Sequence, residues 1–118
     1  MLDVRSATFG IRTRDVDAAR DWYARVLGRP PDLVPDDGIY EWRLAAGAWL
    51  QLLAGQPSAA GSGQVARLGV AEIGAARAAL EAAGARVGEL TTIPDVVAFC
   101  DVEDPFGNGL SLYEDLTE

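Results

Sequence analysis

The first residues of the chain alternate between apolar and polar side chains with the period of a strand. Over residues 7–13, Phe9 and Ile11 fall on one face of a strand, and Thr8 and Arg12 fall on the other. A strand with one apolar and one polar face packs one side on a core. We therefore predict a strand over residues 7–13.

Apolar residues then change to helical spacing up to residue 27. Asp15 suits the N-cap, and Asp17 suits the first turn, where the helix dipole favours acidic side chains. Gly28 suits the position that ends the helix, and the prolines at 30 and 31 prevent its continuation. The predicted buried stripe of this helix is Val16, Ala19, Trp22, Tyr23 and Val26.

Three short strands follow, over residues 32–35, 39–44 and 48–53, and the whole pattern then starts again. Asp37-Gly38 and Ala46-Gly47 supply the turns, and the Gly- and Ser-rich residues 54–63 read as a linker. The second copy predicts a strand over 65–70, a helix over 73–83 that ends at Gly84, and strands over 86–90, 96–102 and 109–114.

The two copies form a sequence repeat. Glu72-Ile73-Gly74-Ala75-Ala76-Arg77 lies 57 residues after Asp15-Val16-Asp17-Ala18-Ala19-Arg20, and both strings stand between a strand and an alanine-containing helix. The order of elements predicts an α+β fold of two βαβββ modules. We expect one domain of 118 residues, with module 1 at about 1–54, a linker at 55–63 and module 2 at about 64–118.

Charge and residue usage exclude several classes of function. A net charge of −8 argues against binding to nucleic acid or to anionic membranes. Cys100 is the one cysteine, no apolar run approaches about 20 residues, and the first residues carry no secretory leader, so we expect a cytoplasmic protein. The chain has no histidine, which removes the commonest metal ligand and the commonest general base.

Two local strings resemble motifs of the vicinal oxygen chelate superfamily, which includes glyoxalases, bleomycin resistance proteins and extradiol dioxygenases. One is the aspartate-led helix from Asp15 to Trp22-Tyr23 with its Leu27-Gly28 end, and the other is Asp104-Pro105-Phe106-Gly107-Asn108 before the last strand. The resemblance covers nearly the whole chain. It implies curled mixed sheets around a central cavity, helices outside, and a homodimer.

The resemblance also implies where a metal would bind in metal-dependent members. Counted from the motifs, the four ligand positions are Thr8, Gln51, Val65 and Ser111. Valine cannot ligate, and the other three offer only neutral oxygens, which bind Zn²⁺ or Fe²⁺ poorly without an anionic partner. We therefore expect no metal and no cofactor, and a metal-dependent glyoxalase-type activity is disfavoured.

Strand alternation predicts which side chains face the cavity. A tight turn at Ala46-Gly47 would pair Leu44 with Trp49 and Trp42 with Gln51, whereas a turn longer by one residue would move Trp42 to the helix side and bring Glu41 and Arg43 inward. Arg67 could hold a ligand anion or neutralise Asp101. The predicted ligand-binding residues are Thr8, Arg12, Tyr40, Trp42, Trp49, Gln51, Arg67, Phe99, Asp101, Ser111 and Tyr113.

Three functions fit these residues. The first is metal-independent binding of a small aromatic or heteroaromatic molecule, as in bleomycin resistance proteins that sequester drugs. The second is a metal-independent isomerase, lyase or cyclase, for which Asp101 is the candidate base because it is the one carboxylate predicted to face inward. The third is a domain that serves only dimerisation or regulation, with Trp42, Trp49 and Phe99 filling the cavity.

Overall fold

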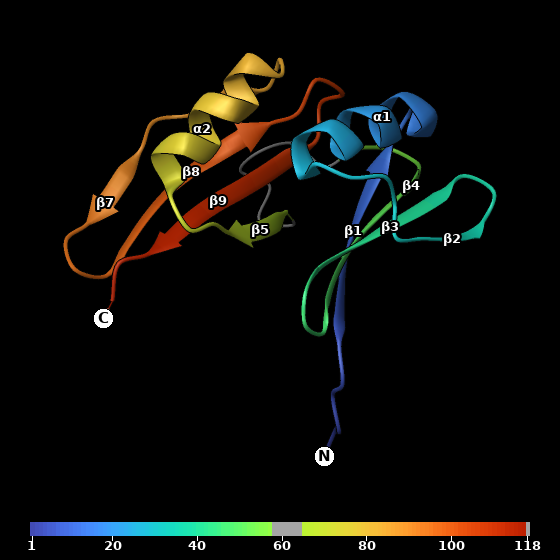
Figure 1. Cartoon of the computed structure of the whole chain (residues 1–118), viewed down its shortest axis with the longest axis horizontal. Coiled ribbons are helices and arrows are strands. Elements are labelled where there is room, and N and C mark those ends of the chain that lie inside the picture. Colours follow the sequence, from blue (N-terminus) through green and yellow to red (C-terminus); the bar gives the residue numbers. More distant parts are fainter. Residues whose placement is uncertain (58–64, 118) are drawn as a thin grey trace. The chain divides into compact units, whose positions relative to one another are not determined.

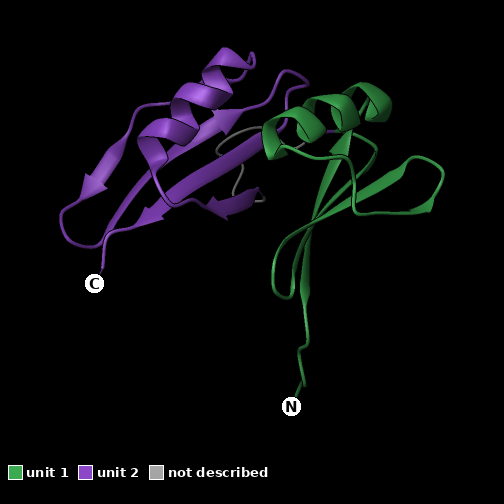
Figure 2. Cartoon of the chain, viewed as in Figure 1, with its two compact units in different colours: residues 1–56 green, residues 57–118 purple. Residues whose placement is uncertain are grey.

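The chain folds into two compact units, residues 1–56 and 57–118 (Figure 2). The computed structural model describes residues 1–57 and 65–117. Most of the predicted linker, residues 58–63, lies outside the described residues. Within the described residues, no helix combines the length and apolar character needed to cross a membrane.

Unit 1 contains a four-stranded sheet with one helix on one of its faces (Figure 1). Its elements are β1 (Ala7–Thr13), α1 (Val16–Leu27), β2 (Leu33–Asp36), β3 (Ile39–Ala45) and β4 (Ala48–Ala54), and the strand order is β1-β4-β3-β2. β1 runs parallel to β4, and the other pairs are antiparallel. The core of the unit lies between α1 and the sheet, where Ala19, Trp22, Tyr23, Leu50 and Leu52 are buried.

Both ends of α1 form as the sequence predicts. The side chain of Asp15 accepts a hydrogen bond from the backbone N–H of Ala18 at 3.1 Å, which satisfies one of the free donors of the first turn. Gly28 ends the helix with a φ of 80°, a left-handed conformation that favours glycine.

Unit 2 repeats the plan with one additional short strand. Its elements are β5 (Ala66–Gly69), α2 (Ile73–Ala82), β6 (Arg86–Val87), β7 (Thr91–Ile93), β8 (Val97–Glu103) and β9 (Gly109–Asp115). The strand order is β5-β9-β8-β6, and β7 also pairs with β8. Ile73, Cys100, Val102, Leu110 and Leu112 form its buried core with α2 on one face (Figure 1).

The strand predicted over residues 86–90 is too long, because β6 covers only Arg86–Val87 and a separate strand, β7, begins at Thr91. Val87 pairs with Val102, and Thr91 pairs with Phe99. The four residue steps from Val87 to Thr91 therefore lie opposite only three steps of β8. The extra residue breaks the ladder between the two short strands.

The last strand extends one residue beyond the predicted range of 109–114. β9 extends through Asp115, and Glu114 Oε1 accepts a hydrogen bond from the backbone N–H of Ile73 at 2.8 Å. Glu72, the residue that corresponds to Asp15, makes no capping bond with its side chain. The first turn of α2 is therefore capped from β9 and not from its own N-cap residue.

The register of the β3–β4 hairpin differs from the simple prediction. Ala45 pairs with Ala48 across the expected two-residue turn, but Arg43 then pairs with Trp49, so Leu44 is an extra residue in β3. The predicted pairs Leu44–Trp49 and Trp42–Gln51 are wrong, because Trp42 pairs with Leu50 and Glu41 pairs with Gln51. A bulge at Leu44, rather than a longer turn, produces the alternative register.

Candidate functional site

Each sheet has one face that α1 or α2 covers and one helix-free face. Since neighbouring residues of a strand point to opposite faces, the pairings assign each predicted site residue to one of them. The helix-free face of unit 1 carries Thr8, Arg12, Trp49 and Gln51, and that of unit 2 carries Arg67, Phe99, Asp101, Ser111 and Tyr113.

Gln51 lies at the centre of the helix-free face of unit 1, between Gly10 of β1 and Glu41 of β3. Its Nε2 donates a hydrogen bond to Glu41 Oε2 at 2.6 Å. Trp49 lies one row away, between Thr8 and Arg43, and is half-buried. The bulge turns Glu41 and Arg43 to this face. The helix-free face of unit 1 therefore presents a carboxylate and a guanidinium, which the register without a bulge would place on the helix face.

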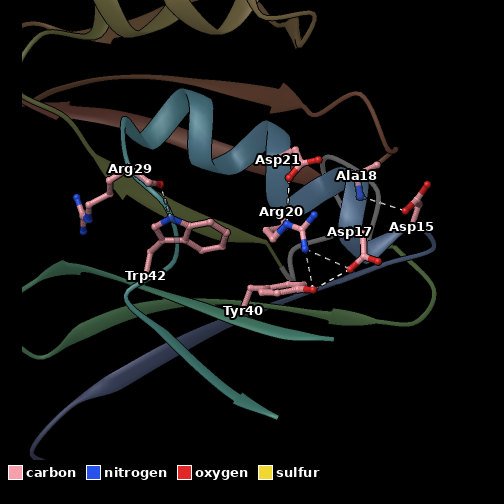
Figure 3. Close-up of polar contacts among 8 residues, drawn as sticks. All are labelled: Asp15, Asp17, Ala18, Arg20, Asp21, Arg29, Tyr40 and Trp42. Carbon is pink, nitrogen blue, oxygen red and sulfur yellow. Dashed lines mark hydrogen bonds and ion pairs between the residues drawn. The ribbon is translucent and has the colours of Figure 1, made fainter. Parts of the chain in front are cut away.

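Tyr40 and Trp42 lie on the helix face, which corrects their predicted inward position (Figure 3). Trp42 is fully buried, its ring centroid lies 6.4 Å from that of Tyr23, and its Nε1 donates to the carbonyl oxygen of Arg29 at 3.0 Å. The physical reason is the bulge, which inverts the alternation of β3 before Leu44 and places both aromatic rings against α1.

The Tyr40 hydroxyl joins β3 to two charged side chains of α1. It donates to Asp17 Oδ1 at 2.8 Å and accepts from Arg20 Nη1 at 3.1 Å, and the guanidinium of Arg20 lies 5.0 Å from the ring centroid (Figure 3). The hydrogen bond to Asp17 raises the pKa of Tyr40, because the carboxylate stabilises the protonated phenol. This cluster attaches the helix to the sheet.

Arg12 extends from the end of β1 over Gly55. Its Nη1 donates to the carbonyl oxygen of Ala54 at 3.3 Å, and a Cβ on Gly55 would lie 2.9 Å from Arg12 Cδ. The arginine therefore rests along the end of β4.

Two parallel rows of side chains cross the helix-free face of unit 2. Arg67, Ser111 and Asp101 form one row over β5, β9 and β8, and Gly69, Tyr113 and Phe99 form the next. Arg67 Nη1 donates to Ser111 Oγ at 3.4 Å. Tyr113 remains 40% exposed and Phe99 is half-buried, so both aromatic rings are accessible on this unit. Asp101, the candidate base, is exposed beside them.

The four positions implied for a metal do not fit a divalent ion. The Gln51 amide is bonded to Glu41, Val65 is a hydrocarbon, and Ser111 Oγ accepts from a guanidinium whose positive charge would oppose a cation. Within residues 1–57 and 65–117, no three His, Cys, Asp or Glu side chains come together to hold a metal ion.

Comparison with known proteins places the chain in a family. Residues 5–112 match the Glyoxalase/Bleomycin resistance protein/Dioxygenase superfamily, and the chain belongs to this superfamily. No curated protein matches the chain in sequence.

Solved structures share the fold at low sequence identity. A glyoxalase/bleomycin resistance protein from Catenulispora acidiphila has a TM-score of 0.74 and 22% identity, over 92% of this chain and 96% of its own. TnmS3, an antibiotic-binding protein from Streptomyces, has a TM-score of 0.73 and 22% identity, over 98% of each chain. Lactoylglutathione lyase from Agrobacterium tumefaciens has a TM-score of 0.70 and 16% identity, over 91% of this chain and 90% of its own. At these identities the likeness establishes the α+β glyoxalase-like fold.

Proposed function

We propose that the chain binds a small aromatic or heteroaromatic molecule without a metal ion and sequesters it, as a drug or a metabolite. The observation that carries the proposal is the exposure of aromatic rings on faces that also present charged groups. Trp49 lies beside Arg43 in unit 1, and Phe99 and Tyr113 lie beside Asp101 in unit 2. Hydrophobic and aromatic side chains with a few polar groups are the usual lining of small-molecule sites.

The family supports this proposal in two ways. Its members include bleomycin resistance proteins, and the fold is shared with an antibiotic-binding protein of similar length. The metal positions of this chain do not suit metal-dependent chemistry, whereas a stacking surface needs no ion. A homodimer in the cytoplasm, with the buried Cys100 as a reduced thiol, completes the proposal.

A binding screen with variants of the aromatic residues tests the proposed function. Compounds with one to three fused aromatic rings are screened by thermal shift, and the dissociation constants of those that bind are measured by calorimetry. Trp49→Ala should weaken the binding of compounds held on unit 1 about tenfold, and Phe99→Ala that of compounds held on unit 2, because each substitution removes a stacking surface worth about 1–1.5 kcal/mol. Trp22→Phe, a change at a buried position of α1, is the control and should leave the dissociation constant unchanged.

Two outcomes contradict the proposed function. Either no compound of the screen binds, or binding is as tight in Trp49→Ala and Phe99→Ala as in the unmodified chain. Sedimentation at micromolar concentration tests the proposed dimer separately, since a monomer has a mass of 12.5 kDa.

A further inference from the structure

A cation and a carboxylate stand at opposite ends of one row on the helix-free face of unit 2. Arg67 on β5 pairs with Ser111 on β9, and Ser111 pairs with Asp101 on β8. Adjacent strands are about 4.8 Å apart, so the backbones of Arg67 and Asp101 are separated by about 10 Å. Because the Arg67 side chain extends to Ser111 on the middle strand, the two charged groups are closer together than the two backbones are.

Within the described residues, Arg67 and Asp101 do not neutralise each other. No ion pair or hydrogen bond joins Arg67 to Asp101 in residues 65–117, and the guanidinium is bonded to Ser111 Oγ. Ser111 is only 1% exposed, so its hydroxyl orients Arg67 rather than meeting solvent. Glu103, the next acidic residue of β8 on this face, differs because Arg86 of β6 stands directly opposite it.

The adjacent row places two aromatic rings, Tyr113 and Phe99, beside this pair of charges. A Cβ on Gly69 would lie 2.8 Å from Tyr113 Cζ and 2.9 Å from its hydroxyl oxygen, so the Tyr113 ring leans over β5, two residues along from Arg67. Phe99 pairs with Tyr113 from β8, on the strand that carries Asp101. The Tyr113 ring is therefore next to Arg67, and the Phe99 ring is next to Asp101.

We propose that this face selects flat aromatic ligands that are amphoteric, with an acidic group at one end and an amine or another N–H donor at the other. The ring system lies on Tyr113 and Phe99, the acidic group meets Arg67, and the donor meets Asp101. Charged hydrogen bonds of this kind orient a stacked ligand that the rings alone would hold in several ways. The inference rests on the proposed function, because it names the ligand class for the aromatic site.

Four naphthalene probes of the same ring size test the inference: 6-(aminomethyl)-2-naphthoic acid, 2-naphthoic acid, 2-(aminomethyl)naphthalene and 2-naphthalenemethanol. Dissociation constants are measured by calorimetry at neutral pH. The amino acid should bind about fivefold more tightly than either singly charged probe, since an exposed ion pair contributes up to about 1 kcal/mol. The neutral probe should bind by stacking alone, and more weakly than the amino acid.

Variants assign each end of the probe to a residue. Arg67→Gln should weaken the binding of only the two probes that carry an acid. Asp101→Asn should weaken the binding of only the two probes that carry an amine. Arg25→Gln and Glu81→Gln, both at exposed helix positions, change the net charge by the same amount and should leave all four constants unchanged. Gly69→Ala should displace the Tyr113 ring and weaken all four probes while Arg67 stays in place.

The results separate the inference from the proposed function. If the four probes bind equally, or if Arg67→Gln and Asp101→Asn act no differently from their charge-matched controls, the inference is overturned and aromatic binding stands. If none of the four probes binds while a compound of the wider screen does, the inference is overturned and the proposed function stands; if no compound binds at all, both are overturned.

Discussion

The indole Nε1 of Trp42 donates a hydrogen bond to the backbone carbonyl oxygen of Arg29 at 3.0 Å. Arg29 follows the end of α1, so the bond joins β3 to the segment that leaves the helix. The Trp42 side chain is fully buried against Tyr23, whereas Trp49, on the next strand, is half-buried on the opposite face. Two tryptophans of one hairpin therefore have different roles.

Substitution of each tryptophan by phenylalanine should separate these roles. Trp42→Phe should lower the free energy of unfolding by about 2 kcal/mol, because it leaves a cavity and removes the donor to Arg29. Trp49→Phe should lower it by less than about 1 kcal/mol, because that ring is partly solvated. Urea denaturation of both variants measures the difference, and equal losses would contradict the bulged register.

Much of the fold could be predicted because it depends on local signals. Asp15 and Gly28 mark the ends of α1 through bonds and dihedral angles that involve only their neighbours in sequence. The apolar stripe with Ala19, Trp22 and Tyr23 follows the helical period, and these residues are buried as expected. Such signals need no knowledge of the partner element.

The faces of Tyr40 and Trp42 could not be derived in the same way, because they depend on one extra residue in β3. A bulge leaves no signature in Ala45, Ala46 and Gly47, whose two-residue turn forms as predicted. What favours the bulged register is tertiary: Trp42 gains the Arg29 carbonyl and Tyr40 gains Asp17, both from a different element. The apolar Leu50 and Leu52 opposite them were the available signal, since paired residues share a face.

The caps of the two helices should respond differently to alanine. Asp15→Ala should lower the free energy of unfolding by about 1 kcal/mol, because the N–H of Ala18 loses its acceptor. Glu114→Ala should cost a similar amount through Ile73, although residue 114 lies 41 positions away in sequence. Glu72→Ala, at the N-cap of α2, is the matched control and should have little effect, because its side chain makes no capping bond. Thermal or urea unfolding measures all three, and a larger loss for Glu72→Ala than for Glu114→Ala would contradict the assignment.

Ionisation of Tyr40 should report the contact between α1 and β3. The hydrogen bond to Asp17 raises the pKa of Tyr40 above its ordinary value of about 10, so the folded state holds the phenol proton more tightly than the unfolded state does. The resulting stability is present below about pH 10 and is lost as the pH rises through the folded-state pKa. Tyrosinate absorbance, taken as the difference from Tyr40→Phe, should show titration at lower pH in Asp17→Asn. Asp3→Asn, in the exposed N-terminal residues, should leave the titration in place.

Asp32 should make the stability of unit 1 depend on acidic pH. Its Oδ2 accepts from the backbone N–H of Arg43 at 2.7 Å and from Arg29 Nη2 at 3.3 Å, and these contacts, the backbone bond first, hold the pKa of Asp32 below its ordinary value. Because the folded-state pKa is the lower one, the unfolded chain takes up the proton first as the pH falls. The contribution is therefore complete above about pH 5, declines through the unfolded value of about 3.9, and is lost below the folded-state pKa.

The variant Asp32→Asn isolates this effect, because asparagine keeps an oxygen acceptor for Arg43 and removes only the charge. Relative to the unmodified chain, Asp32→Asn should be least stable at neutral pH, and the difference should narrow as the pH is lowered from about 5 towards 2. Asp37→Asn, an exposed change in the same hairpin, controls for net charge. Urea denaturation at a series of pH values measures the difference, and a gap that stayed constant or widened in acid would show that the charge of Asp32 does not stabilise the β2–β3 connection to α1.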